Sequence, residues 1–252
     1  MGLLSKLGIG NGAGTTRNVT RPSHGMPVGG RMTPTNGPAG AVGSPRAPEI
    51  QEATRMSNGL KEFLWNLDGL GRGTMLDLGP AWQTTLSFFI ERGFRVTSDD
   101  LLRSWKEFMN EEEGRLKNAV AGSDSVDVTP AGRATRFIEE SLRYKEGAFD
   151  AVLLWDILDY LEPAVAKQTV ACITEYLRPG GIVFAMFHSK KPDVFLRYRV
   201  ADSHTLQVIS AAPICPAQRV YQNREIQELF SRFRTSKSFV GRDQLREALF
   251  IK

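Results

Sequence analysis

Apolar and polar residues follow one another along this chain in blocks that predict strands and helices in turn. Short apolar runs predict five strands, at residues 74–78, 94–98, 136–138, 149–156 and 182–187. Apolar residues spaced three and four apart predict helices at 49–67, 84–92, 104–120, 163–177 and 224–233. A helix that continues through Ser141 competes with the strand at 136–138. Alternating strands and helices are typical of an open, mostly parallel sheet covered on both faces.

Two further apolar runs close the chain, at residues 238–240 and 248–251. The polar link between them is too short for a crossover helix, so we expect this pair of strands to be antiparallel. The pattern as a whole predicts a Rossmann-like, doubly wound α/β fold. It would have a mostly parallel seven-stranded sheet, an antiparallel C-terminal strand and helices on both faces.

The N-terminal segment has a different composition from the rest. Residues 1–48 contain eleven of the 24 glycines and six of the 13 prolines, with few clustered apolar residues. Such a segment buries too little apolar surface to offset the entropy lost on ordering. We therefore expect a disordered tail at 1–48, followed by one folded domain at 49–252.

The charge distribution, the cysteine positions and the lengths of the apolar runs bear on the surface, on metal binding and on membrane insertion. The net charge is +4, with −7 over residues 57–177 and +7 over 178–252, which indicates either a polarised surface or ordinary solvated faces. Cys172 and Cys215 lie far apart, outside any metal-like spacing, which predicts no metal site and fits a reducing cytoplasm. No apolar run reaches the roughly 18 residues of a membrane span.

In an open α/β sheet, ligands bind beyond the carboxyl ends of the strands, where the strand order reverses. The polar or glycine residues expected there are Asp77, Gly79, Asp99, Asp100, Ser141, Asp156 and His188. A carboxylate that ends the second strand, about 20 residues after the glycine, is placed to bind a ribose diol. Asp99 and Asp100 both have this spacing, and a helix cap is the alternative role for either.

The order of these motifs resembles that of class I S-adenosylmethionine-dependent methyltransferases. The resemblance rests on five segments and covers roughly residues 60–252. They are Leu-Asp-Leu-Gly at 76–79, Thr-Ser-Asp-Asp at 97–100, the acidic stretch at 136–142, the apolar strand and following helix at 149–161, and Leu-Arg-Pro-Gly-Gly at 177–181. It implies a Rossmann-like fold, S-adenosyl-L-methionine as cofactor, and transfer of its methyl group.

The resemblance also implies roles for individual residues. Cofactor binding would fall to Asp77, Gly79 and Ala81 at the methionine end, Asp99 or Asp100 at the ribose, Ser141 and Leu142 at the adenine, and Trp155 beside the sulfonium. Methyl transfer mainly requires a nucleophile placed in line with the methyl group, so a general base is optional. Asp156, His188 and Tyr160 are the candidates if the acceptor must lose a proton. For His188 a structural role is the alternative.

The loop after the first motif departs from the family pattern. The family commonly has Gly-x-Gly-x-Gly there, whereas this chain has Gly79-Pro80-Ala81-Trp82-Gln83. Glycine allows a backbone to approach a ligand without a Cβ in the way, and Pro80 removes an N–H as well. Three outcomes remain: the loop binds the cofactor, binds it weakly, or is filled by Trp82.

Three functions therefore compete. The first is a methyltransferase acting on a small-molecule acceptor, and the second is an inactive methyltransferase fold that serves as a binding or scaffold protein. The third is a nicotinamide-dependent oxidoreductase, which is disfavoured because no Tyr is followed four residues later by Lys. Nucleic-acid methylation is disfavoured too, since an Asn/Asp-Pro-Pro-Tyr/Phe motif does not follow the strand at 149–156.

Residues 188–222 do not belong to the regular alternation of strands and helices. We interpret them as an insertion on the substrate side of the sheet. The segment is rich in basic and aromatic residues, namely Lys190, Lys191, Arg197, Tyr198, Arg199, Arg219 and Tyr221. This content favours an anionic or planar small-molecule substrate.

Overall fold

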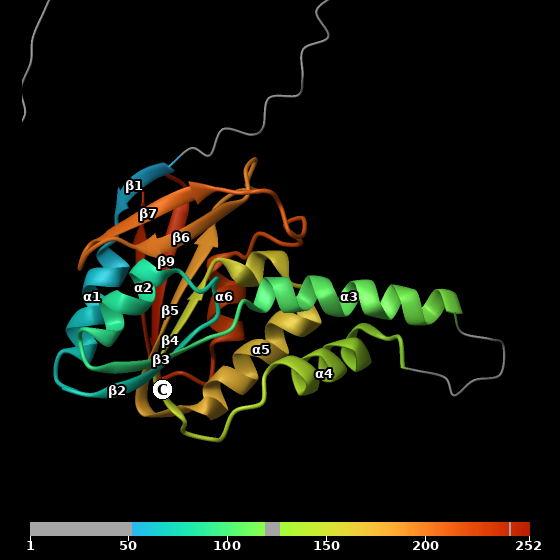
Figure 1. Cartoon of the computed structure of the whole chain (residues 1–252), viewed down its shortest axis with the longest axis horizontal. Coiled ribbons are helices and arrows are strands. Elements are labelled where there is room, and N and C mark those ends of the chain that lie inside the picture. Colours follow the sequence, from blue (N-terminus) through green and yellow to red (C-terminus); the bar gives the residue numbers. More distant parts are fainter. Residues whose placement is uncertain (1–51, 119–126, 242) are drawn as a thin grey trace, which may run out of the picture. The chain divides into compact units, whose positions relative to one another are not determined.

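A computed structural model describes residues 52–118, 127–241 and 243–252. The predicted disordered tail at 1–48 lies outside these ranges. The described residues form a main sheet of six strands in the order β3-β2-β4-β5-β9-β8 and a small sheet in the order β1-β7-β6 (Figure 1). The main sheet contains β2 (Gly73–Asp77), β3 (Phe94–Ser98), β4 (Phe149–Trp155), β5 (Leu177–His188), β8 (Thr235–Val240) and β9 (Leu245–Ile251).

The strand directions confirm a doubly wound, mostly parallel sheet. The strands β2, β3, β4 and β5 are parallel to one another, while β9 is antiparallel to both β5 and β8, as predicted for the closing pair. Because β2 lies between β3 and β4, the chain extends the sheet first to one side and then to the other. The order therefore reverses between β2 and β4, and the carboxyl ends of both strands lie at the same edge.

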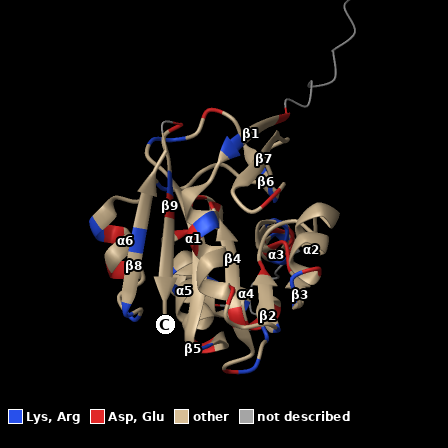
Figure 2. Ribbon diagram, turned by 90° about the vertical axis from the view of Figure 1, so that its left-hand side faces the viewer, with Lys and Arg blue, Asp and Glu red and all other residues tan. Residues whose placement is uncertain are grey.

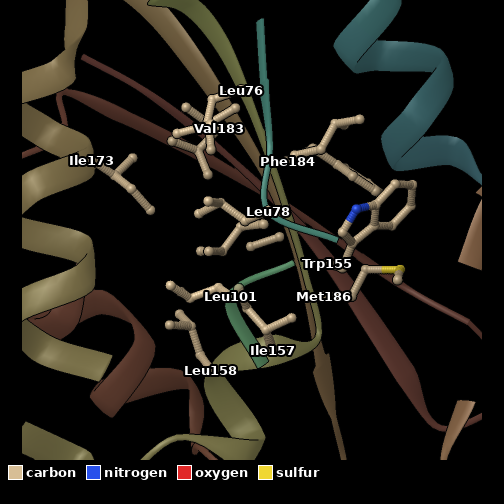
Figure 3. Packing of buried hydrophobic residues seen from close by; sticks show 14 of the residues in the cluster. Leu76, Leu78, Leu101, Trp155, Ile157, Leu158, Ile173, Val183, Phe184 and Met186 are labelled. Carbon is tan, nitrogen blue, oxygen red and sulfur yellow. The ribbon is translucent and has the colours of Figure 1, made fainter. Parts of the chain in front are cut away.

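Helices cover both faces of the main sheet. On one face lie α1 (Asn58–Leu67) and α2 (Gln83–Ile90), and on the other lie α3 (Leu101–Asn118), α4 (Pro130–Ser141), α5 (Pro163–Tyr176) and α6 (Asn223–Leu229) (Figure 1). Successive residues of a strand point to opposite faces. Accordingly Val183 and Phe184 of β5 lie on opposite sides of the sheet (Figure 3), and Phe184 packs against Phe63 of α1 at 5.9 Å between ring centroids. No helix in the described ranges is long and apolar enough to cross a membrane.

The segment at 136–138 is helical and belongs to α4, so the main sheet has six strands rather than the expected seven. Thr129 caps the helix by accepting a hydrogen bond from the Gly132 N–H, and Pro130 occupies its first turn. The apolar side of α4 packs on α3, where Phe137 meets Trp105 edge-on at 5.0 Å. The competing helix prediction is thereby confirmed, because this apolar face finds its partner on a helix.

The helix expected at 49–67 is only partly present. Its first part is the strand β1 (Glu52–Met56), which pairs antiparallel with β7 (Thr205–Ser210), and α1 begins at Asn58 after the cap Ser57. The strand β6 (Leu196–Val200) completes the small sheet. Residues 188–222 thus contribute two of its three strands. The partner of β1 lies about 150 positions further along the chain, so the residues around β1 carry no local signal for a strand.

Candidate active site at the carboxyl edge of the sheet

Asp77 ends β2 and its side chain is fully buried. Its Oδ1 accepts hydrogen bonds from Trp155 Nε1 at 2.7 Å and from the Gly79 N–H at 2.9 Å. Its Oδ2 is buried without a hydrogen-bond partner in the described part of the chain. Burial raises the pKa of Asp77 to about 6, although both hydrogen bonds act to lower it. The carboxyl group therefore keeps one oxygen that a donor could satisfy.

The indole of Trp155 covers Gly79. A Cβ at position 79 would lie only 2.6 Å from Trp155 Nε1, so no larger residue fits there while the indole stays in place. The indole is 3% exposed, stacks on Tyr198 at 6.2 Å, and lies beside Phe184 (Figure 3). Trp155 also has a φ of 52°, which for a bulky residue costs about 1–3 kcal/mol. The surroundings thus hold this side chain against Gly79 despite backbone strain.

Trp82, a possible occupant of the loop, is half-buried at the end of that loop. It precedes α2, and the Arg199 guanidinium lies 5.6 Å from its ring centroid. Ala81 is exposed in the same loop. The residue that contacts the glycine is therefore Trp155, from the neighbouring strand rather than from the loop.

Asp99 and Asp100 follow β3 and have different partners. Asp100 accepts from Arg197 Nη2 at 3.2 Å and from the Arg103 N–H, at the start of α3, at 3.3 Å. Asp99 is half-buried and accepts from the Tyr144 hydroxyl at 3.3 Å, and burial raises its pKa. Asp100 thus serves as an ion-pair partner and helix cap, while Asp99 is the better placed of the two for a ligand. Sequence reasoning missed Tyr144.

Ser141 and Leu142, expected beside an adenine, close the helix α4. Ser141 is its last residue, and the buried Leu142 accepts a hydrogen bond from the Tyr176 hydroxyl at 2.6 Å. These contacts hold α4 to α5. The structure gives the two residues no contact with Asp77 or Asp99 among those described, and their role at an adenine stays a prediction.

His188 ends β5 and is buried beside two carboxylates. Its backbone N–H donates to Asp159 Oδ2 at 2.7 Å, and its ring Nδ1 lies 2.9 Å from the same oxygen. The other ring nitrogen, Nε2, lies 3.7 Å from Asp156 Oδ2 and has no hydrogen-bond partner among the described residues. Asp159 therefore fixes the ring so that Nε2 is the nitrogen left for a ligand.

The three predicted catalytic candidates lie together in this cluster. Tyr160 meets the His188 ring edge-on at 6.1 Å, and Asp156 accepts a hydrogen bond from the Tyr198 hydroxyl at 3.3 Å. Asp159 and Tyr198 were not among the predicted site residues. A signal for Asp159 existed, because it follows Asp156 by three residues and lies in the single turn η1 (Ile157–Tyr160) that Asp156 precedes. In the described ranges no group of His, Cys, Asp and Glu side chains has the arrangement of a metal site.

The surroundings of the cluster shift the pKa values of its acidic and basic groups upward. Burial raises the pKa of Asp156 to about 7. Burial acts to lower the pKa of His188, but its hydrogen bond to Asp159 and the charges of both carboxylates outweigh this and raise it. These groups can therefore take up and release a proton at the carboxyl ends of β4 and β5.

The arginines of residues 188–222 are paired with carboxylates. Arg197 binds Asp100, Arg199 binds Glu52 and Arg219 binds Glu225. Figure 2 likewise shows both signs of charge intermixed, for example on α6. The charges of these three arginines are therefore compensated within the chain, and the anionic substrate stays a prediction. The aromatic argument for a planar one is unaffected.

No protein-family model and no curated protein matches this sequence. Several solved structures are similar to the structure of this chain. A 1,6-didemethyltoxoflavin-N1-methyltransferase from Burkholderia thailandensis is 18% identical, with 78% of this chain and 79% of that chain covered and a TM-score of 0.44. An S-adenosylmethionine-dependent methyltransferase from Mesorhizobium loti is 12% identical, with 76% and 96% covered and a TM-score of 0.43.

The fold itself follows from the strand order and directions. A parallel set β3-β2-β4-β5 is extended by the antiparallel β9 and then by β8, with helices on both faces. The described part of the chain therefore has a Rossmann-like, doubly wound fold.

Proposed function

We propose that this protein is an S-adenosylmethionine-dependent methyltransferase that acts on a small-molecule acceptor. The observation that carries the proposal is the pairing of two groups at one edge of the sheet. Asp77 and Gly79 follow β2, beside which the strand order reverses, and Asp99 follows the neighbouring β3. The His188 cluster lies at the ends of the next strands, β4 and β5. This arrangement supports a nucleotide-type site beside a group that can accept a proton.

The residues present can bind the cofactor if one side chain, that of Trp155, moves. The unpaired Oδ2 of Asp77 suits the positively charged amino group of the methionine part, and Asp99 suits the ribose hydroxyls. The indole of Trp155 covers Gly79 and would have to leave it. When bound, the cofactor supplies an electrophilic methyl group.

The chain's own residues would prepare the acceptor. His188 Nε2, held by the Asp159 contact at the other ring nitrogen, takes a proton from an acceptor O–H or N–H. Asp156, 3.7 Å away, stabilises the imidazolium that forms. Burial excludes water from this step. Asp159 acts as a positioning residue, because its carboxylate binds both the ring and the backbone N–H of His188.

The alternative is a binding or scaffold protein with a methyltransferase fold. The contact between Trp155 and Gly79 favours it, since the indole there is held by both a hydrogen bond and a stacking partner. Under this alternative the indole never leaves, and the cofactor does not bind.

Calorimetric titration separates the two functions. We expect the full chain to bind S-adenosylmethionine and S-adenosylhomocysteine, and Asp99→Ala to bind at least tenfold more weakly, which is about 1.4 kcal/mol. Asp100→Ala is the matched control; we expect a smaller effect because Asp100 already binds Arg197 and caps α3. Absence of binding by the wild-type chain would refute the methyltransferase and support the scaffold.

A further inference from the structure

A cavity of about 260 Å³ lies between the small sheet and the end of β5. Its lining residues include Arg55 of β1, Leu196 and Tyr198 of β6, Val208 of β7, Leu245 of β9 and His188. The cavity therefore connects the small sheet, whose function is otherwise unexplained, with the proton-accepting cluster. Tyr198 and Trp155 stack between this cavity and Gly79.

The walls of the cavity are mainly apolar, and its one arginine is neutralised. Arg55 Nη1 lies 2.6 Å from Glu247 Oε1, and its Nε lies 2.7 Å from Asp243 Oδ2. Two carboxylates thus face one guanidinium, so an anionic ligand would meet no uncompensated positive charge from Arg55. Burying an unpaired anion against apolar walls is costly.

One polar atom of the lining is unsatisfied. His188 lines the cavity, is 8% exposed, and its Nε2 has no hydrogen-bond partner among the described residues. Two polar groups close by have partners: the Tyr198 hydroxyl donates to Asp156, and Asp159 Oδ2 binds the opposite ring nitrogen of His188. A ligand in this cavity therefore meets mainly apolar walls, and the His188 imidazole beside it carries a ring nitrogen that lacks a partner among the described residues.

The volume limits the ligand further. Pockets for drug-sized molecules have about 300–1,000 Å³, so this cavity suits a smaller molecule of one or two rings. We propose that the cavity binds the acceptor, and that the acceptor is an uncharged, mainly apolar ring compound with one ionisable O–H or N–H directed at His188. This inference rests on the proposed function for its role in methyl transfer, but the binding itself does not require the cofactor.

Equilibrium dialysis with two matched probes tests the inference. 2-Naphthol and 2-naphthoate share one ring system but are neutral and anionic respectively at pH 7. We expect the wild-type chain to bind 2-naphthol at least tenfold more tightly than 2-naphthoate. Val208→Trp should fill the cavity and weaken 2-naphthol binding at least tenfold. Val240→Trp places the same residue on the exposed face of β8, outside the cavity, and should bind as the wild type does.

A failure of this inference can be distinguished from a failure of the proposed function. The inference is overturned if 2-naphthol does not bind, if 2-naphthoate binds as tightly, or if a folded Val208→Trp variant binds 2-naphthol normally. Far-ultraviolet circular dichroism and the Tm verify that the variant is folded. Dialysis is performed without cofactor, so loss of cofactor binding with 2-naphthol binding intact would refute the methyltransferase and leave the cavity's ligand class standing.

Discussion

Trp155 determines more of the site than any other single residue. Its indole donates to the buried Asp77, stacks on Tyr198 and covers Gly79. These contacts link β2, β4 and β6 at the point where the strand order reverses. A ligand that reaches Gly79 must therefore displace this side chain.

Gly79→Ala tests this contact. The added Cβ would lie 2.6 Å from Trp155 Nε1, so the indole or the loop must shift, and we expect a loss of about 1–3 kcal/mol in the free energy of unfolding. Gly69→Ala is the control, because a Cβ there meets nothing within 4 Å. Urea unfolding measures both variants. Equal stabilities of the two would show that the indole does not constrain position 79.

Asp156→Asn tests the charge state of the His188 cluster. Burial raises the folded-state pKa of Asp156 from 3.8 to about 7. The stabilisation that comes from its protonated form is therefore complete below pH 4 and is lost as the pH rises through 7. The raised pKa values of Asp77 and His188 act in the same direction.

We accordingly expect the free energy of unfolding of the wild-type chain to fall between pH 5 and pH 8. For Asp156→Asn the fall should be smaller by about 2–3 kcal/mol. Urea unfolding at both pH values gives this difference. Asp193→Asn is the control, since that side chain is 87% exposed, and it should follow the wild type. The same pH dependence in all three proteins would contradict a raised pKa at Asp156.

At the scale of elements, a buried carboxylate attaches the N-terminal elements to the sheet. Glu247 of β9 is 2% exposed and accepts from the Gly59 N–H, in the first turn of α1, at 2.6 Å. It also binds Arg55 of β1. A negative charge at a helix N-terminus is favourable, and burial strengthens it. Glu247 therefore fixes where β1 ends and α1 begins on the main sheet.

Glu247→Ala should destabilise the protein by about 3 kcal/mol, because it leaves the Gly59 N–H and part of the Arg55 guanidinium without an acceptor. The matched control is Glu107→Ala, which breaks an exposed pair with Arg103 on α3 and should cost less than about 1 kcal/mol. Chemical denaturation compares the two. A loss at Glu247 no larger than that at Glu107 would refute this role.

At the scale of the whole domain, the small sheet covers the carboxyl edge of the main sheet. Two contacts of β6 hold it there: the Val200 N–H donates to Thr85 Oγ1 of α2 at 3.0 Å, and Arg197 binds Asp100. Both contacts are largely buried. Access to the site from this side therefore depends on the position of the β6–β7 hairpin.

Arg197→Ala should release the hairpin. We expect amide hydrogen exchange in β6 and β7 to accelerate about tenfold, which corresponds to about 1.4 kcal/mol of local stability. Lys190→Ala is the control, because Lys190 precedes β6 and its pair with Asp193 is exposed, and such pairs contribute little. Mass spectrometry measures the exchange rates of β6 and β7 in both variants and in the wild type. Equal rates in both variants and the wild type would show that the Arg197–Asp100 pair does not hold the hairpin.

The sequence predicted the main sheet because its signals are local. Buried parallel strands such as β4 appear as continuous apolar runs, and capping residues mark helix starts. The same locality explains the two wrong elements. The segment at 136–138 is short and apolar, which fits a strand or a helix equally, and only its packing on Trp105 and Phe108 distinguishes them. The strand β1 depends on pairing with β7, far along the chain.

For the site, the sequence by itself determined which residues end the strands of the parallel sheet. Asp77, Asp99, Asp156 and His188 follow from strand periodicity, because every parallel strand ends at the same edge. The tertiary structure alone decided what each of them binds. The contact of Trp155 with Gly79, the pairing of Asp100 with Arg197 and the cavity beside His188 all join segments separated by more than 50 residues. Such contacts depend on how the sheets and helices pack together, and residue spacing carries no record of that packing.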